Sequence, residues 1–129
     1  MSEHDEQVAL FEWAILHTVQ YPELEAMFAI PNGAYTFRKL DRNGRWYSGV
    51  AKKLVREGLK KGVPDIFLAV PRGKYHGLFI ELKFGQNRLT PEQIEWFKLL
   101  TWQGYRCVVC YGWQEASQVI LDYLEKEEA

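Results

Sequence analysis

Several features that mark particular protein classes are scarce in this sequence of 129 residues. No apolar run approaches the ~20 residues of a membrane-spanning helix, so no membrane partner is expected. The first ten residues, MSEHDEQVAL, are acidic where a signal or transit peptide would be basic, which predicts a cytoplasmic protein. The three histidines, His4, His17 and His76, lack the spacing of metal ligands, and we assign them no catalytic role.

Cysteine is limited to Cys107 and Cys110. Their C-x-x-C spacing is compatible with a thiol redox pair or with half of a zinc site. They lie, however, in the β-rich run YRCVVCY, where positions three apart point to opposite faces, and no second pair of Cys or His completes a tetrahedral site. We interpret both as buried structural thiols.

Lysine and arginine are absent from the first 37 residues, whereas residues 38–61 hold nine of the 16 basic residues and only two acidic ones. A concentrated basic face is typical of contact with a phosphate backbone, while a solvated helix face more often mixes both signs. The candidate nucleic-acid-binding residues are Arg38, Arg42, Arg45, Lys52, Lys53, Arg56, Lys60 and Lys61.

Length and composition, with 47% hydrophobic and 26% charged residues, predict one globular domain over residues 1–129. Periodicity and turn residues predict a mixed order of helices and strands, which indicates an α/β fold with a mixed central sheet flanked by helices. The predicted helices are 6–20, 49–62, 91–103 and a C-terminal one from 114. The predicted strands are 65–70, 78–83 and 105–111, with a short strand running into a turn over 26–33 and a basic hairpin at 35–48.

Two polar residues on the predicted helices have both a structural and a functional interpretation. Glu12 falls on the face where Val8, Ile15 and Val19 recur at helical spacing, so it is either a solvated residue at the border of that face or a functional group. Gln93 occupies the capping-box position of TPEQ, after Thr90 as N-cap, and that role alone would explain it.

The sequence also places acidic residues at the ends of two predicted strands. If DIFLAV and LFIELK pair antiparallel, Asp65 and Glu81 converge at one end of the sheet. Two nearby carboxylates repel, and a divalent cation with oxygen ligands relieves the repulsion. Lys83 shares a face with Glu81, where its ammonium could orient a water or stabilise charge on a phosphate, as metal-assisted phosphodiester hydrolysis requires. Alternatively, these are ordinary charges at strand ends.

PD, followed by 15 residues and ELK, resembles the PD-(D/E)XK nuclease superfamily. More narrowly, the segments IPNG, EGLKKGVPDIF, GLFIELKFGQNRLTPEQIEWFKLL and GYRCVVCY resemble the VRR-NUC family, and the resemblance spans nearly the whole chain. It implies a restriction-endonuclease-like fold with the core order α-β-β-β-α-β.

The resemblance also implies roles for individual residues. Asp65 and Glu81 would be ligands of Mg²⁺ or Mn²⁺, with the carbonyl of Leu82 as a further ligand, and Lys83 would be the catalytic lysine. Glu12 would be the family's N-terminal acidic residue near the metal, and Gln93 would support the site as well as the helix cap. No small-molecule cofactor beyond the metal is expected.

The implied function is that of a metal-dependent, structure-specific endonuclease acting on branched DNA of the Holliday-junction or flap type. Stand-alone members of the family are often phage-associated, which points to the cytoplasm of a bacterial or phage-infected cell, and symmetric junction cutting favours a homodimer. The alternatives are a non-catalytic DNA-binding module and a protein-interaction subunit with an incidental metal site. The stretch YTFRKLDRNGRWYS would contact substrate, form a subunit interface or pack in the core.

Overall fold

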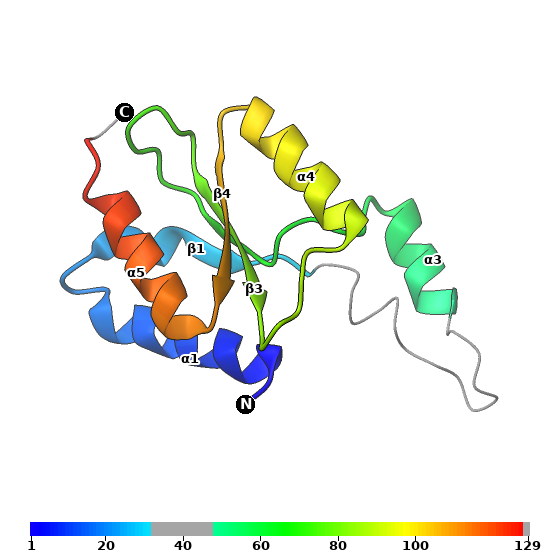
Figure 1. Cartoon of the computed structure of the whole chain (residues 1–129), viewed down its shortest axis with the longest axis horizontal. Helices are drawn as coiled ribbons and strands as arrows, with labels where there is room; N and C mark the ends of the chain where they lie inside the picture. The colour runs from blue at the N-terminus through cyan, green and yellow to red at the C-terminus, as the bar shows by residue number, and fades with distance from the viewer. Residues whose placement is uncertain (32–47, 128–129) are drawn as a thin grey trace.

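A computed structural model describes residues 1–31 and 48–127, with the backbone alone for residues 48–51. A four-stranded sheet lies between helices, with α1 and α5 on one side and α4 on the other (Figure 1). The elements are α1 Glu3–His17, a short 3-10 helix Pro22–Ala26, β1 Met27–Ala29, α3 Ser48–Arg56, β2 Ile66–Leu68, β3 Leu78–Lys83, α4 Pro91–Trp102, β4 Arg106–Tyr111 and α5 Trp113–Leu124. The α/β prediction is confirmed. The hairpin predicted at 35–48 falls almost entirely outside the described residues.

The sheet has the order β1-β2-β3-β4 and mixes strand directions. β2 runs antiparallel to both β1 and β3, whereas β3 and β4 are parallel. Parallel neighbours need a long crossover, which α4 provides. The carboxyl ends of β3 and β4 therefore lie at the same end of the sheet as the amino end of β2.

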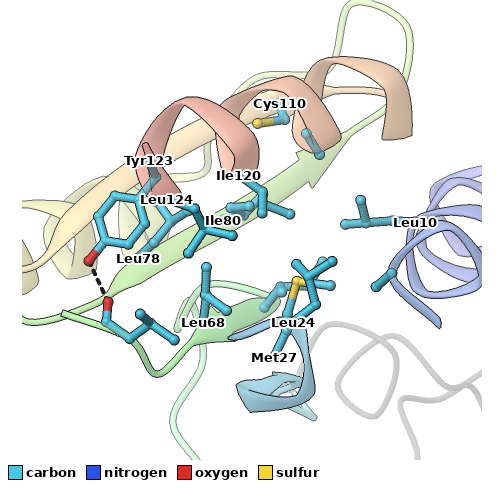
Figure 2. Packing of buried hydrophobic residues seen from close by; sticks show 14 of the residues in the cluster. Leu10, Leu24, Met27, Leu68, Leu78, Ile80, Cys110, Ile120, Tyr123 and Leu124 are labelled. Atoms are coloured by element: carbon cyan, nitrogen blue, oxygen red, sulfur yellow. Dashed lines mark hydrogen bonds between the residues drawn. The ribbon is translucent and has the colours of Figure 1, made fainter. Parts of the chain in front are cut away.

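One face of β3 supplies the centre of the hydrophobic core. Leu78, Ile80 and Leu82 are almost completely buried, as strand alternation predicts for residues two apart. They pack with side chains of α1 and α5, including Leu10 and Ile120, as Figure 2 shows. Near the other end of this cluster, the Tyr123 hydroxyl donates a hydrogen bond of 2.6 Å to the Val70 carbonyl oxygen. The core thus fixes β3 between β2, β4 and two helices.

Aromatic side chains cover the opposite face of the sheet near the amino end of β3. The rings of Phe67 and Phe79 stack with centroids 4.3 Å apart, and Tyr105 meets both rings edge-on. Glu81 and Lys83 follow Phe79 on this same face. Two buried charged residues therefore continue a face that starts as an apolar layer.

The two cysteines are free thiols on opposite faces of β4. Cys110 is fully buried in the core, and burial raises its pKa to about 12. Cys107 is half-buried, and burial raises its pKa as well. The interpretation of Cys110 as a buried structural thiol is confirmed, while Cys107 is less enclosed than expected.

Helix α1 buries a different face from the predicted one. Val8, Ile15 and Val19 are exposed by 44%, 74% and 97%, whereas Glu6, Leu10 and Ala14 are buried. The prediction of a buried Val8–Val19 stripe is therefore wrong.

None of the helices within residues 1–31 and 48–127 is long and apolar enough to cross a membrane.

Candidate active site

Asp65 and Glu81 come together at one end of the sheet, as the predicted pairing of the two inner strands requires. The register pairs Ile66 with Ile80, so the next position sets Asp65 opposite Glu81. Asp65 Oδ2 accepts a hydrogen bond of 3.1 Å from the Leu82 N–H, which holds the carboxylate against β3. Two acidic groups 16 positions apart in sequence thus lie side by side in the fold.

Glu81 is an acid in an unfavourable environment. Its side chain is only 4% exposed, and Oε1 is buried without a hydrogen-bond partner among the described residues. Burial and, next to it, hydrogen bonding and repulsion from the Asp65 carboxyl group raise the pKa of Glu81, while Lys83 opposes the rise; together they bring this pKa to about 10. Two ionised carboxylates have no hydrogen to share, so Asp65 satisfies Glu81 only when a proton or a cation lies between them.

Lys83 is the buried positive charge of this cluster. Its side chain is 7% exposed, and Nζ lies 4.0 Å from Glu81 Oε2. A lysine this enclosed is uncommon unless a charge or hydrogen bond compensates it. The Lys83 ammonium group lies next to the acidic pair, as the sequence predicted.

The Leu82 carbonyl has a direction that fits its predicted role. The Gly77 carbonyl oxygen, just before β3, accepts a hydrogen bond from the Arg106 N–H of β4. Backbone groups alternate in direction along a strand, so the odd-numbered residues of β3 point their N–H and C=O groups towards β4. Leu82 directs its backbone groups the other way, as its N–H bond to Asp65 shows. In an extended strand the N–H and C=O of one residue point to the same side, so this carbonyl faces the Asp65 side of the strand.

Gln93 performs the capping role. Thr90 Oγ1 accepts from the Gln93 N–H at 3.2 Å, and the Thr90 N–H donates to Gln93 Oε1 at 2.8 Å. Gln93 is buried at the start of α4. The capping interpretation is confirmed, and any contribution of its amide nitrogen to the site remains a prediction.

Glu12 is not brought to the acidic pair. It is exposed and lines a shallow surface hollow of about 290 Å³ with His4, Val8 and Ile15. Within residues 1–31 and 48–127, no group of three or more His, Cys, Asp or Glu side chains is arranged to hold a metal ion, so Glu12 completes no such site. This placement does not support the expected role of Glu12, which was predicted on or beside the buried face of α1, whereas the face that is buried carries Glu6 and Leu10.

Glu3 is the acidic residue of α1 that the sequence argument missed. It lies in the first turn of α1 and is close enough to Glu81 that its charge raises the pKa of that carboxyl group. The N-terminus lies beside the carboxyl end of β3 (Figure 1). No sequence signal separated Glu3 from Glu12, because the choice depends on which face of the helix is buried.

The basic residues divide between described and undescribed parts of the chain. Arg38, Arg42 and Arg45 lie outside the described residues. The others are exposed, on or just after α3: Lys52, Lys53, Arg56, Lys60 and Lys61. Only Lys61 among these five forms an ion pair within the described residues, 3.7 Å from Glu92. Their exposure is what a surface that contacts phosphates requires.

The donor set fits a hard divalent cation. Two carboxylates and one backbone carbonyl are all oxygen donors, which suit Mg²⁺ or Mn²⁺ better than the softer transition metals. The buried Oε1 of Glu81 without a partner is the kind of acceptor that a cation would satisfy. The residues present therefore fit the metal that the sequence implied.

Comparison with known proteins agrees with this architecture. The family model described as the VRR-NUC domain matches residues 37–114. A solved structure described as a VRR_NUC domain protein is 28% identical, with a TM-score of 0.78, over 99% of this chain and 92% of that chain. Among curated proteins, none matches significantly. The chain belongs to the VRR-NUC family, a nuclease-related family.

Proposed function

We propose that this protein is a metal-dependent endonuclease that hydrolyses phosphodiester bonds in branched DNA of the Holliday-junction or flap type. The observation that carries the proposal is the buried Glu81, with an unsatisfied oxygen, between Asp65 and Lys83. Acidic residues whose pKa is strongly shifted by burial and by a specific charged neighbour are characteristic of functional sites. The nuclease-related family gives the reaction class.

Asp65, Glu81 and the Leu82 carbonyl would hold Mg²⁺ or Mn²⁺, and Glu3 adds negative charge nearby. When bound, such an ion supplies Lewis-acid stabilisation of the charge that develops on the scissile phosphate. The strand pairing holds both carboxylates in place before substrate arrives, so little reorganisation is needed at the moment of reaction.

Lys83 acts on the reacting groups through its three N–H donors. They can orient the attacking water or stabilise a phosphate oxygen. Its position 4.0 Å from Glu81 Oε2 keeps this charge at the edge where the phosphate would lie. The reaction joins the water oxygen to phosphorus and breaks the bond from phosphorus to the leaving sugar oxygen; the proton of the water passes to solvent, and the leaving oxygen takes one up from solvent.

The preference for branched DNA rests on shape recognition. The exposed cations at 52, 53, 56, 60 and 61 would contact phosphates, which position DNA without reading base sequence. A homodimer fits this substrate because two cuts related by symmetry need two sites related by a two-fold axis.

Cleavage by Lys83→Met tests the proposal. Because the lysine is buried, methionine fills its space better than alanine while removing the charge. The wild type should cut a labelled four-way junction or a flap with Mg²⁺ or Mn²⁺ and not with EDTA. Lys83→Met should reduce the rate by about 100-fold or more and retain binding in gel-shift experiments.

Lys98→Met is the matched control, since Lys98 is an exposed lysine paired with Glu95 on α4. It should cut at the wild-type rate. Undiminished cutting by Lys83→Met would remove Lys83 from the mechanism. A metal-independent shift of DNA by the wild type, without any cutting, would favour the non-catalytic binding module.

A further inference from the structure

The loop between β3 and α4 begins immediately after Lys83 and is exposed throughout residues 84–88. It carries Phe84, which is 43% exposed, and Arg88. Arg88 forms no ion pair with any acid in the described parts of the chain. It also lies outside the basic segment at 38–61, so no role was predicted for it. A cation that pairs with none of the described acids therefore follows the candidate catalytic lysine by five positions.

Tyr111 holds this loop in place. Its hydroxyl donates a hydrogen bond of 2.8 Å to the Asn87 carbonyl oxygen, next to Arg88 in sequence. Tyr111 is also the register partner of Lys83 in the parallel pair, so both side chains lie on the same face of the sheet. A phenol beside Lys83 thus fixes the backbone one residue before Arg88.

Two further contacts restrict the loop at its ends. The Asn87 N–H donates to the Phe84 carbonyl at 3.3 Å, which closes a turn around Gly85, whose φ of 65° suits glycine. At the other end, the capping box of α4 fixes Thr90. The loop is therefore a defined structure rather than a long flexible connection, and it presents Arg88 from a fixed backbone.

We propose that Arg88 binds a DNA phosphate next to the one that is cut, and that Tyr111 is the positioning residue for this contact. The inference rests on the proposed nuclease function. Asp65 and Glu81 repel the polyanionic backbone, so a cation on the loop that leaves this end of β3 favours entry of the strand. The planar guanidinium of arginine matches phosphate geometry with two parallel hydrogen bonds.

The test measures DNA binding without cutting. Lys83→Met serves as the background, with a fluorescent flap substrate and Mg²⁺, and anisotropy gives the Kd at several salt concentrations. Adding Arg88→Gln should weaken binding by about 3- to 30-fold and reduce the slope of log K against log salt by about 0.9, as the loss of one phosphate contact predicts.

Arg106→Gln is the matched control. Arg106 is an exposed arginine at the opposite end of β4 from Tyr111, five residues or about 17 Å along the strand. It should leave the Kd and the salt slope unchanged. Tyr111→Phe removes only the hydroxyl, so it should weaken binding in the same direction while leaving the salt slope at its full value, because the arginine charge remains.

The outcomes separate this inference from the function on which it rests. If the wild type cuts DNA but Arg88→Gln behaves like Arg106→Gln, the Arg88 contact is overturned and the nuclease proposal stands. If the wild type neither binds nor cuts any of the DNA forms, both proposals fail. A lower salt slope for Arg88→Gln alone supports the contact.

Discussion

At the scale of single residues, Glu81 shows a conflict between stability and function. A carboxyl group that is 4% exposed, next to Asp65, is costly for the fold when it is ionised. Apolar residues would fill this position on β3 more favourably. Retention of an acid there is understandable if a bound cation offsets the cost, as in other sites that sacrifice stability for activity.

The pH dependence of stability without metal follows from the raised pKa of Glu81. Its usual value is 4.5 and its folded value is about 10, so between these values the folded state binds a proton that the unfolded state has lost. Stability in EDTA should therefore fall as pH rises through this range. Glu81→Gln removes the titrating group, so it should be close to the wild type at pH 5 and more stable at pH 8, by at least about 1 kcal/mol or roughly 3–5 °C in Tm.

Thermal unfolding at pH 5 to 8 measures this difference, and Mn²⁺ titration supplies the second readout. The wild type should gain stability with Mn²⁺, by about 2.7 kcal/mol at 100 times the Kd, whereas Glu81→Gln should gain little. Equal responses of both proteins to Mn²⁺ would show that Glu81 does not hold the ion.

At the scale of elements, β3 and α1 show what sequence patterns can and cannot predict. The bounds of β3 match the predicted strand, in which Leu78, Ile80 and Leu82 alternate onto one buried face. In α1 two stripes contain apolar residues, and periodicity alone does not choose between them. The buried stripe includes Glu6, an acid that the pattern would exclude from the core.

The reason is a tertiary contact that no local pattern contains. Glu6 Oε2 accepts a hydrogen bond of 2.7 Å from the Trp113 N–H at the start of α5. The N-cap of α5 is Gly112, with φ of 98° and no side-chain cap, so Glu6 supplies the missing acceptor from a position 107 residues away. Its negative charge also suits the amino end of a helix.

Glu6→Ala should therefore destabilise the protein by about 1–3 kcal/mol, since it removes the acceptor for a part-buried N–H and a helix cap together. Glu6→Gln keeps an oxygen acceptor and should cost less. Urea denaturation of both variants measures the effect.

Glu12→Ala provides the comparison on the same helix, because Glu12 is exposed. Its effect should stay within about 0.5 kcal/mol, and its cleavage rate should match the wild type. Loss of metal-dependent cutting in Glu12→Ala, with stability unchanged, would instead restore Glu12 to the site.

At the scale of the whole molecule, the sequence predicted the fold class and the meeting of Asp65 with Glu81, because both depend on strand pairing and alternation. It did not predict how α1 is rotated on the sheet, which depends on contacts with α5. For the same reason it chose Glu12 over Glu3, although Glu3 is the acid near the carboxyl end of β3.

The assembly state is a prediction at this scale. A homodimer should have about twice the 15.1 kDa mass of one chain in light scattering coupled to size-exclusion chromatography. The mass should stay dimeric on dilution through the concentrations at which a four-way junction is cut. A monomeric mass at those concentrations would contradict paired, symmetric cutting and would favour a substrate with a single cut, such as a flap.

Because β2 and β3 run in opposite directions, the sheet has one end that carries the acidic pair and another end where the connecting turn can accept insertions. Because the two strands meet at Asp65 and Glu81 at one end, their connection, residues 69–77, lies at the other. Lengthening this turn at its exposed positions, Gly73 and Lys74, would leave the acidic edge untouched. A label or reporter peptide introduced there should therefore leave Asp65 and Glu81 paired as they are.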